Sequence, residues 1–253
     1  MFKKNKPICY ILVYKEYEII KESLDFFVTL SKYFDIVVIE NPSNNTPQIK
    51  KLITAFGKSL KIRRYYLFEE NITNNAYQMV LEKEIKKIEK CPYVVVSDGD
   101  LTIEDGDSWL KEALGILNYK EVFCCSAGIL MDNLPLETFP EAVNWIPKLI
   151  STGPFDEGKT GCHLIMFRGK ELVNYLKWIK KNKKFFVDGD IYDYCYKVLG
   201  KKWARTRENK IYHLTWDLYK DLDYEYTKLK TSKTMVEMWK HHNFSNFTLK
   251  EFF

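Results

Sequence analysis

The sequence is short of the residues that build structural metal clusters and disulfide frameworks. Its 253 residues contain six cysteines and four histidines, and no two cysteines form a C-x-x-C pair. Structural zinc and a disulfide scaffold are therefore poorly supported, and reduced thiols buried in a core are the expectation. Long apolar runs are missing as well. The longest near the N-terminus, 8–14, falls far short of the ~20 residues that a membrane-spanning helix needs.

Charge of one sign is also scarce, because 39 lysines and arginines stand against 34 acidic residues, a net charge of +5. No basic cluster is interleaved with aromatic residues as a base-stacking groove requires, so we expect no nucleic-acid partner. Lys15 and Glu16 follow the first apolar run at once, without the small-residue cleavage site of a signal peptide, so we expect a cytoplasmic protein. Aromatic residues are abundant at 15%, which suits the binding of sugar faces as well as a bulky core.

The first hundred residues alternate strand and helix signals. Short apolar, β-branched runs predict strands, and apolar positions three to four residues apart predict helices. Strands are expected at 8–14, 36–39, 62–68 and 93–96, and helices at 16–34, 47–56 and 74–90. This order is typical of an α/β fold with a mixed, mostly parallel sheet and helices on both faces.

The second half is less regular. Strands are expected at 122–130, 163–167 and 211–214, and helices at 169–181 and 190–199. The longest stretch without a clear period, 132–161, is expected to be a mobile loop near the site. Residues 153–160 match the P-loop pattern G-x-x-x-x-G-K-[ST], but a strand-like segment follows instead of the required helix, so we reject that motif. A basic, aromatic, helical tail is expected at 216–253.

Polar clusters occur at three points along the chain where an open α/β sheet would collect its ligands, near the carboxyl ends of strands. The clusters are Glu40-Asn41, Asp98-Gly99-Asp100 and Asp188-Gly189-Asp190. The two carboxylates that follow the strand at 93–96 can share Mg²⁺ or Mn²⁺ and leave positions open for phosphate oxygens. An ordinary turn is the alternative, since a D-x-D triplet is a weak motif by itself.

The context of this triplet favours the metal site. The run V-V-V-S-D-G-D at 94–100 resembles the D-x-D motif of GT-A-fold glycosyltransferases, especially the inverting family 2 type. Further segments, within roughly residues 8–215, resemble other parts of that family in the same order: I-C-Y-I-L-V-Y at 8–14, I-V-V-I-E-N-P-S at 36–43, E-E-N-I-T-N-N-A at 69–76, T-G-C-H-L-I-M-F-R at 160–168 and F-F-V-D-G-D-I-Y-D-Y-C-Y-K at 185–197.

The resemblance implies roles for the matching residues. The metal, Mn²⁺ or Mg²⁺, would be held by Asp98 and Asp100, with His213 as a further metal or diphosphate contact; a buried core histidine is the alternative. The nucleotide would be bound by Tyr14, Glu40, Asn41, Asn75, Asp98 and Gly99. The general base of the reaction would be Asp188, at the start of a helix. Asp190 is its competitor for this role, and helix capping is the alternative role of Asp188.

Two departures from the family pattern affect these assignments. Glu40 stands where Asp is usual, so the residue that would bind the nucleobase is either Glu40 or Asn41. Val187 replaces the first acid of the usual E-D pair, which makes Asp188 the preferred base.

The resemblance therefore implies a metal-dependent glycosyltransferase that moves a sugar, with inversion, from a nucleotide-diphosphate sugar to a hydroxyl of a glycan or lipid-linked glycan. The GT-A-like catalytic domain would span 1–215, with a nucleotide-binding half at 1–105 and an acceptor half at 106–215. The tail at 216–253 would touch the inner face of the membrane or pack back on the domain. A sugar nucleotidyltransferase, which would need a glycine-rich phosphate loop after the first strand, and a catalytically degenerate glycan-binding module are the alternatives.

Overall fold

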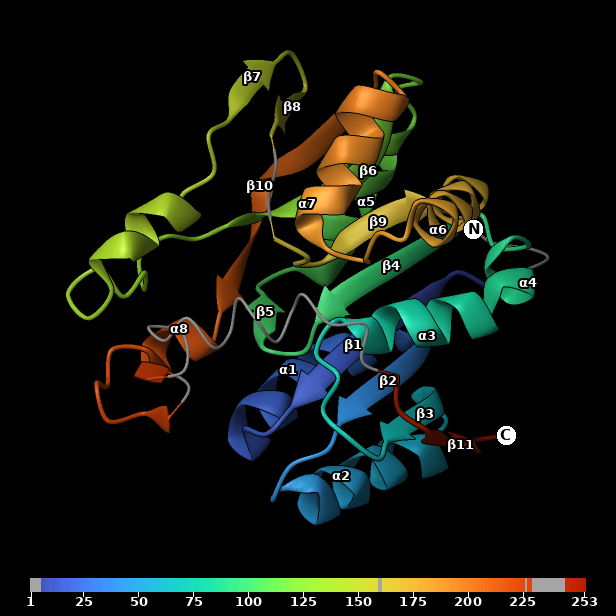
Figure 1. Cartoon of the computed structure of the whole chain (residues 1–253), viewed down its shortest axis with the longest axis vertical. Coiled ribbons are helices and arrows are strands. Elements are labelled where there is room, and N and C mark those ends of the chain that lie inside the picture. The colour runs from blue at the N-terminus through green and yellow to red at the C-terminus, as the bar shows by residue number, and fades with distance from the viewer. Residues whose placement is uncertain (1–5, 159–160, 226, 229–243) are drawn as a thin grey trace.

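The computed structural model describes residues 6–158, 161–225, 227–228 and 244–253. Its centre is a mixed sheet in the strand order β11-β3-β2-β1-β4-β9-β6-β10-β8-β7, with β5 paired to β10 (Figure 1). The strands are β1 (Ile8–Tyr14), β2 (Asp35–Asn41), β3 (Ile62–Phe68), β4 (Tyr93–Asp98), β5 (Leu101–Ile103), β6 (Val122–Ile129), β7 (Ile150–Thr152), β8 (Phe155–Glu157), β9 (Ile165–Arg168), β10 (Lys202–His213) and β11 (Phe247–Glu251).

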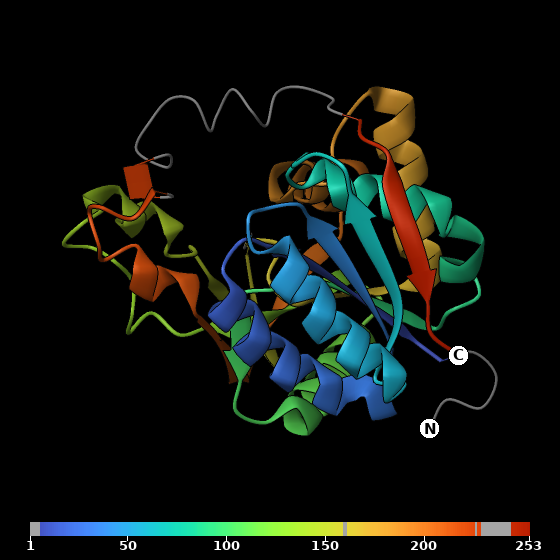
Figure 2. The same ribbon diagram turned by 90° about the horizontal axis from the view of Figure 1, so that it is seen from below.

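Helices cover both faces of the sheet (Figures 1 and 2). One face packs against α1 (Tyr17–Thr29), α2 (Thr46–Lys58) and α5 (Gly106–Leu117). The other face packs against α3 (Asn75–Lys83), α4 (Ile85–Ile88), α6 (Gly169–Asn182) and α7 (Asp188–Tyr192). Shorter helical turns are η1 (Leu30–Lys32), η2 (Pro140–Trp145), the π-helix η3 (Asp193–Val198) and α8 (Thr215–Leu218). The predicted α/β fold with helices on both faces is confirmed.

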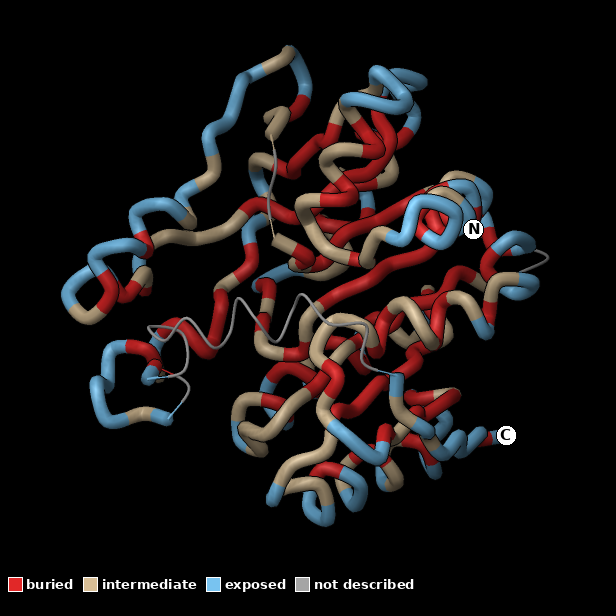
Figure 3. Tube along the Cα trace, viewed as in Figure 1, coloured by how far each residue is buried: buried red, intermediate tan, exposed pale blue. Residues whose placement is uncertain are grey.

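The two-sided core explains why the first strand carries so little polar character. Along β1, Cys9, Ile11 and Val13 pack into the core on the α1 side, whereas Ile8 and Tyr10 pack on the α3 side. Successive side chains of a strand point to opposite faces, so a strand covered on both faces is apolar throughout. Figure 3 shows the result as buried chain running through the central strands.

Parallel pairing is concentrated where the predicted site lies. The strands β3, β2, β1 and β4 run parallel to one another, and β9 then pairs antiparallel with both β4 and β6. The register places Tyr14 opposite Asn41 and Leu12 opposite Asp98. The carboxyl ends of β1, β2 and β4 therefore meet at one edge of the sheet.

The helix predicted over 74–90 is divided into α3 and α4 at Glu84. The Glu84 carboxylate is buried, and it accepts hydrogen bonds from the hydroxyls of Tyr10 (2.6 Å) and Tyr66 (2.7 Å) on the sheet. Arg64 Nε lies 2.9 Å from the same carboxylate. A buried carboxylate must be paired in this way, and the break in the helix lets Glu84 meet all three partners.

The stretch 132–161, predicted as a loop, contains regular structure. It holds η2 and the hairpin of β7 and β8, which extends the sheet beyond β10. Phe139 and Ala142 pack with Trp216 and Tyr219 in a small separate core. This stretch and α8 consequently lie on the same side of the molecule in Figures 1 and 2. The end of the rejected P-loop pattern, 159–160, lies outside the described residues.

The prediction of a helical tail at 216–253 is wrong for the end of the chain. Its last residues form β11, which pairs antiparallel with β3 and covers the edge that β3 would otherwise expose. The Phe252 ring packs so tightly on Gly57 of α2 that a Cβ at Gly57 would lie 2.4 Å from it. Two aromatic residues of the predicted tail, Tyr226 and Trp239, lie outside the described residues. None of the described helices is both long and apolar enough to cross a bilayer.

Candidate active site

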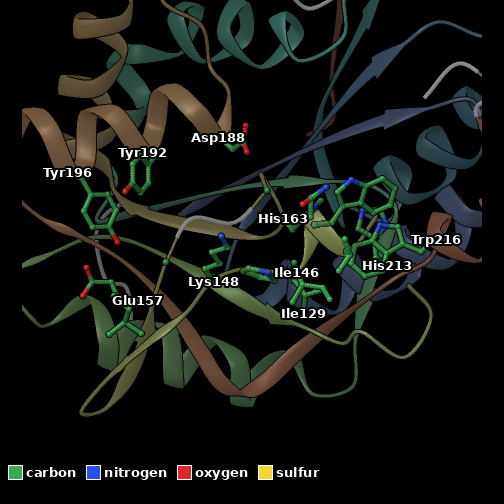
Figure 4. A pocket seen from close by; sticks show the side chains of 17 residues that line it. Ile129, Ile146, Lys148, Glu157, His163, Asp188, Tyr192, Tyr196, His213 and Trp216 are labelled. Carbon is green, nitrogen blue, oxygen red and sulfur yellow. The ribbon is translucent and has the colours of Figure 1, made fainter. Parts of the chain in front are cut away.

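The carboxyl ends of β1, β2 and β4 border a pocket of about 370 Å³, which we call the strand-end pocket. It is lined, among others, by Tyr14, Asn41, Asp98, Gly99 and Asp100. Beside it lies a pocket of about 770 Å³, the aromatic pocket, lined among others by Ile129, Trp145, Tyr192, Tyr196 and Trp216 (Figure 4). The two pockets share Gly161, His163, Asp188 and His213. The predicted base and the predicted metal histidine therefore lie where the pockets meet.

Gly99 fixes the D-x-D turn against the first strand. Its N–H donates a 2.7 Å hydrogen bond to the carbonyl of Leu12. A Cβ at this position would lie 2.5 Å from Val13 Cγ1 and 2.8 Å from the Leu12 carbonyl oxygen. Only glycine allows this close approach, which holds Asp98 and Asp100 at the carboxyl end of β1.

The Asp98 carboxylate is oriented by a buried tyrosine. Tyr77 of α3 donates a 3.1 Å hydrogen bond from its hydroxyl to Asp98 Oδ1. Burial, together with the nearby Asp98 charge, raises the pKa of Tyr77 well above its ordinary value, so the hydroxyl keeps its proton and remains a donor. The other oxygen, Oδ2, lies 3.2 Å from His163 Nδ1, although not in hydrogen-bond geometry.

Asp100 is held from the opposite side by the end of β10. Thr215 Oγ1 donates a 2.6 Å hydrogen bond to Asp100 Oδ2, and the backbone N–H of Leu214 donates to the Asp100 carbonyl. His213 Nδ1 lies 3.7 Å from the same Oδ2, and the His213 ring stacks on Trp216 with centroids 4.8 Å apart. Among the described residues, the buried Oδ1 atom of Asp100 has no hydrogen-bond partner.

His163 is a site residue that the sequence analysis did not assign. Its ring meets that of His213 edge-on, with centroids 4.8 Å apart, so the two histidines connect Asp98 to Asp100. Gly161 makes room for it, since a Cβ there would lie 2.4 Å from His163 Nε2. It lies two residues before β9, the antiparallel neighbour of the strand that carries the D-x-D triplet, so its place beside Asp98 became visible only in the structure.

The residues at this edge fit a divalent cation. Carboxylate oxygens suit Mg²⁺ and Mn²⁺, and the unpartnered Oδ1 of Asp100 is a buried oxygen that a cation would satisfy. Within the part of the chain that the structure describes, no three His, Cys, Asp or Glu side chains form a preformed metal cluster. The protein would therefore supply only part of the coordination, and phosphate oxygens would suit the remaining positions.

The structure separates the two candidates for the base. Asp188, at the start of α7, lines both pockets, and its Oδ1 accepts a 2.9 Å hydrogen bond from the N–H of Gly189. Asp190 is buried and lines neither pocket. Its carboxylate accepts a 2.8 Å hydrogen bond from the N–H of Phe185 and lies 3.2 Å from Lys184 Nζ, so it holds the chain entering α7.

The structure also separates Glu40 from Asn41. Glu40 is fully buried outside the strand-end pocket, and its carboxylate accepts hydrogen bonds from the hydroxyls of Thr46 and Tyr65. Burial raises the pKa of Glu40 above its ordinary value of 4.5, although both hydrogen bonds act to lower it. Asn41 lines the pocket and bridges to the following loop, donating to the carbonyl of Thr73 and accepting from the N–H of Ile72.

Asn75 does not line the strand-end pocket. The lining residues of this segment are instead Asn71, Thr73 and Asn74, which precede α3. Thr73 has a φ of 53°, a left-handed conformation that is uncommon for a residue other than glycine. The polar groups that this segment offers to the pocket therefore come from the turn before the helix.

The aromatic pocket is built by a π-helix and by the turn after β10. Tyr192 and Tyr196 project from the run of α7 and η3, with ring centroids 4.5 Å apart, whereas His213 and Trp216 come from β10 and α8 (Figure 4). Tyr196 is fixed by the N–H of Trp203, which donates a 3.3 Å hydrogen bond to its hydroxyl. Such flat faces, with a few polar groups nearby, suit a sugar-containing ligand.

Comparison with known sequences finds relatives but no matching family model. The chain is 40% identical over 253 residues to the uncharacterised protein L142 of Acanthamoeba polyphaga mimivirus. The alignment covers 98% of this chain and 51% of that protein. It is 41% identical over 252 residues to the uncharacterised protein L137 of the same virus, and this alignment covers 98% of this chain and 34% of that protein. The chain thus spans about half, or less, of the length of these relatives.

Two solved structures share the arrangement of strands and helices. One is GalNAc-T7 with UDP, GalNAc and Mn²⁺, with a TM-score of 0.57, 11% identity, and coverage of 84% of this chain and 44% of that chain. The other is the mannosyltransferase PcManGT from Pyrobaculum calidifontis with GDP-Man and Mn²⁺, with a TM-score of 0.54, 15% identity, and coverage of 93% and 64%. The fold is GT-A-like. The GT-A-like fold thus carries the strand-end pocket at the edge where its first parallel strands end.

Proposed function

We propose that the chain is a nucleotide-sugar-dependent glycosyltransferase that transfers a sugar, with inversion, to a hydroxyl of a glycan or lipid-linked glycan. The observation that carries the proposal is the position of Asp188, on the boundary between a pocket with the D-x-D carboxylates and a pocket with aromatic walls. A transfer between two substrates needs a base at such a boundary, within reach of the accepting hydroxyl.

The strand-end pocket is the proposed donor site, in the nucleotide-binding half at 1–105. Tyr14 and Asn41 border it at the ends of β1 and β2 and would contact the base and ribose; Glu40 instead supports the turn into α2. The two GT-A-fold structures that resemble this chain were solved with UDP or GDP-Man and Mn²⁺, which supports a nucleotide and a divalent metal here.

Asp98 and Asp100 would hold Mn²⁺ or Mg²⁺, with the imidazoles of His163 and His213 beside them. When bound, the cation would neutralise the negative charge that develops on the leaving diphosphate. The chain itself keeps both carboxylates oriented, because Tyr77 donates to Asp98 and Thr215 donates to Asp100. Such partners behind the metal ligands fix ligand geometry.

Asp188 would accept the proton of the attacking hydroxyl, which enters from the aromatic pocket in the acceptor half at 106–215. The rings of Tyr192 and Tyr196 would support the acceptor sugar on one side of Asp188, and Trp216 on the other. Asp190 would take no part in the reaction, because its carboxylate is buried and engaged by Lys184 and Phe185.

Titration calorimetry with UDP, GDP, dTDP and CMP, each with and without Mn²⁺, tests the donor site. We expect at least one nucleotide to bind with an affinity that depends on Mn²⁺, and the same nucleotide to raise the melting temperature, since it binds only the folded state. A glycan-binding module would bind glycans without metal-dependent nucleotide affinity, and that result would contradict the proposal. Formation of a nucleotide-sugar from a sugar phosphate would indicate a nucleotidyltransferase instead.

A further inference from the structure

One basic side chain reaches the strand-end pocket. Among the described residues that line it, Lys15 carries the single lysine or arginine side chain. It directly follows β1, beside Tyr14 and close to the D-x-D turn. Its ammonium group is therefore the permanent positive charge that the described chain offers to an anion in this pocket.

A carboxylate from a distant part of the sequence forms an ion pair with that ammonium group. Glu225 Oε2 lies 2.5 Å from Lys15 Nζ, although 210 residues separate the two in sequence. The adjacent residues make a second link, since the Tyr224 hydroxyl donates a 2.8 Å hydrogen bond to Glu16 Oε1. Tyr219 and Tyr224 also line the strand-end pocket, so the segment 219–225 contributes to its wall.

The backbone at Lys15 is held in an uncommon conformation. Its φ is 69°, in the left-handed region that residues with a Cβ rarely adopt, and Asn45 Nδ2 donates a 2.7 Å hydrogen bond to its carbonyl. Strained backbone of this kind persists where the surrounding structure enforces it, and it is concentrated at functional sites. Here it turns the chain from β1 toward α1, whose residues Ile19 and Ile20 also line the pocket.

We propose that Lys15 binds the diphosphate of the donor and that Glu225 is its internal competitor, so that a bound nucleotide displaces Glu225 and loosens the wall at 219–225. This inference rests on the proposed donor site. The exchange is favourable in principle, because 73% of the Glu225 side chain is exposed and an exposed ion pair contributes little. A diphosphate confined in the pocket would offer Lys15 stronger, charge-assisted hydrogen bonds.

The test compares the binding of UDP or GDP with Mn²⁺, whichever binds the unaltered protein, to Lys15→Met, Glu225→Gln and the double variant. Loss of the Lys15 charge should weaken binding about tenfold or more, since hydrogen bonds to charged groups contribute most. Removal of the Glu225 charge should strengthen binding about two- to fivefold, the measured range for exposed pairs. The double variant should match Lys15→Met, because the competitor matters only when Lys15 is present.

Hydrogen–deuterium exchange gives a readout that is independent of affinity. The nucleotide should speed exchange over 219–225 in the unaltered protein by up to about fivefold, the worth of an exposed ion pair, and Glu225→Gln should show the same increase before the nucleotide is added. Asp107→Asn is the matched control, because it removes an exposed 2.7 Å ion pair with Lys32 that borders neither pocket. Asp107→Asn should change neither the nucleotide affinity nor the exchange rate over 219–225.

The outcomes separate the inference from the proposed function. If Glu225→Gln weakens nucleotide binding, Glu225 only secures the pocket wall, and the competition is refuted while the donor site stands. If Lys15→Met binds as tightly as the unaltered protein, Lys15 does not contact the diphosphate. If no nucleotide binds the unaltered protein, the proposed function fails and the inference fails with it.

Discussion

Two aspartates one residue apart, Asp188 and Asp190, illustrate what individual residues contribute to this site. The sequence offers both as bases at the start of a helix, whereas the structure places one on the boundary of the two pockets and the other in the core. The difference arises from the helical turn itself, since residues two apart point in different directions around a helix. Spacing alone therefore identifies the pair, and packing divides the roles.

The first prediction concerns this pair. Asp188→Asn preserves volume and can still accept the hydrogen bond from the N–H of Gly189, but it cannot take a proton at neutral pH, so kcat should fall by roughly 10²–10⁴. Nucleotide affinity should change little, and calorimetry beside steady-state transfer measures both. Asp190→Asn should mainly lower stability, since it weakens the contact with Lys184. Near-normal kcat in Asp188→Asn would refute the assignment of the base.

The second prediction concerns Tyr77, which acts through Asp98. Tyr77→Phe removes the hydroxyl that donates to Asp98 Oδ1, and we expect the affinity for Mn²⁺ in the presence of nucleotide to fall roughly 10–100-fold, as for other partners of metal ligands. Electron paramagnetic resonance of free Mn²⁺ measures this affinity. Tyr65→Phe is the control, because its hydroxyl donates to Glu40 outside the pocket. Equal Mn²⁺ affinity in both variants would exclude a role for Tyr77 in holding Asp98.

The third prediction concerns the buried carboxyl of Glu40. Its pKa is raised in the folded state, so Glu40 holds its proton more tightly in the folded protein than in the unfolded chain at pH values from the ordinary 4.5 upward to the raised pKa. The contribution of Glu40 to the free energy of unfolding should therefore decline across that window as the pH rises. The Glu40→Gln side chain cannot titrate. The free energy of unfolding of this variant, minus that of the unaltered protein, should therefore increase with pH over the same window. Denaturant unfolding of both proteins from pH 4 to 8 checks this, and a constant difference would contradict it.

Among the secondary-structure elements, those fixed by local pattern were predicted best. The strands β1 and β4 follow from short apolar runs that are buried on both faces. The partners of Glu84, at the break between α3 and α4, could not be predicted, because Tyr10 and Tyr66 reach it from distant strands. The strand β11 was missed for a similar reason, since its pairing partner β3 lies about 180 residues earlier in the chain.

The fourth prediction concerns the attachment of β11. Phe252 is buried against Gly57, so Phe252→Ala should lower the free energy of unfolding by about 3 kcal/mol. The neighbouring Phe253 is 95% exposed, and Phe253→Ala should change stability by less than about 0.5 kcal/mol. Chemical denaturation of the two variants makes the comparison. Equal stability in both would mean that β11 does not anchor the end of the chain in solution.

For the whole molecule, the sequence and the structure agree on where the candidate site lies and differ on which side chains line it. The D-x-D triplet was located correctly at the edge of the sheet because it follows a buried parallel strand. Glu40 could not be excluded from the pocket by pattern, since Tyr65 from the neighbouring strand decides which way its carboxylate turns. His163 was not recognised because its position beside Asp98 depends on the antiparallel pairing of β9 with β4.

The two pockets and the boundary between them lead to one central claim, that the chain transfers sugar from a nucleotide-sugar. The most direct measurement is the release of nucleoside diphosphate from a panel of nucleotide-sugars with Mn²⁺, by the unaltered protein and by Asp100→Ala. We predict that at least one donor is turned over, that turnover requires the metal, and that Asp100→Ala loses it while the melting temperature stays within a few degrees. Undiminished turnover in Asp100→Ala, or no turnover of any donor by the unaltered protein, would contradict the account.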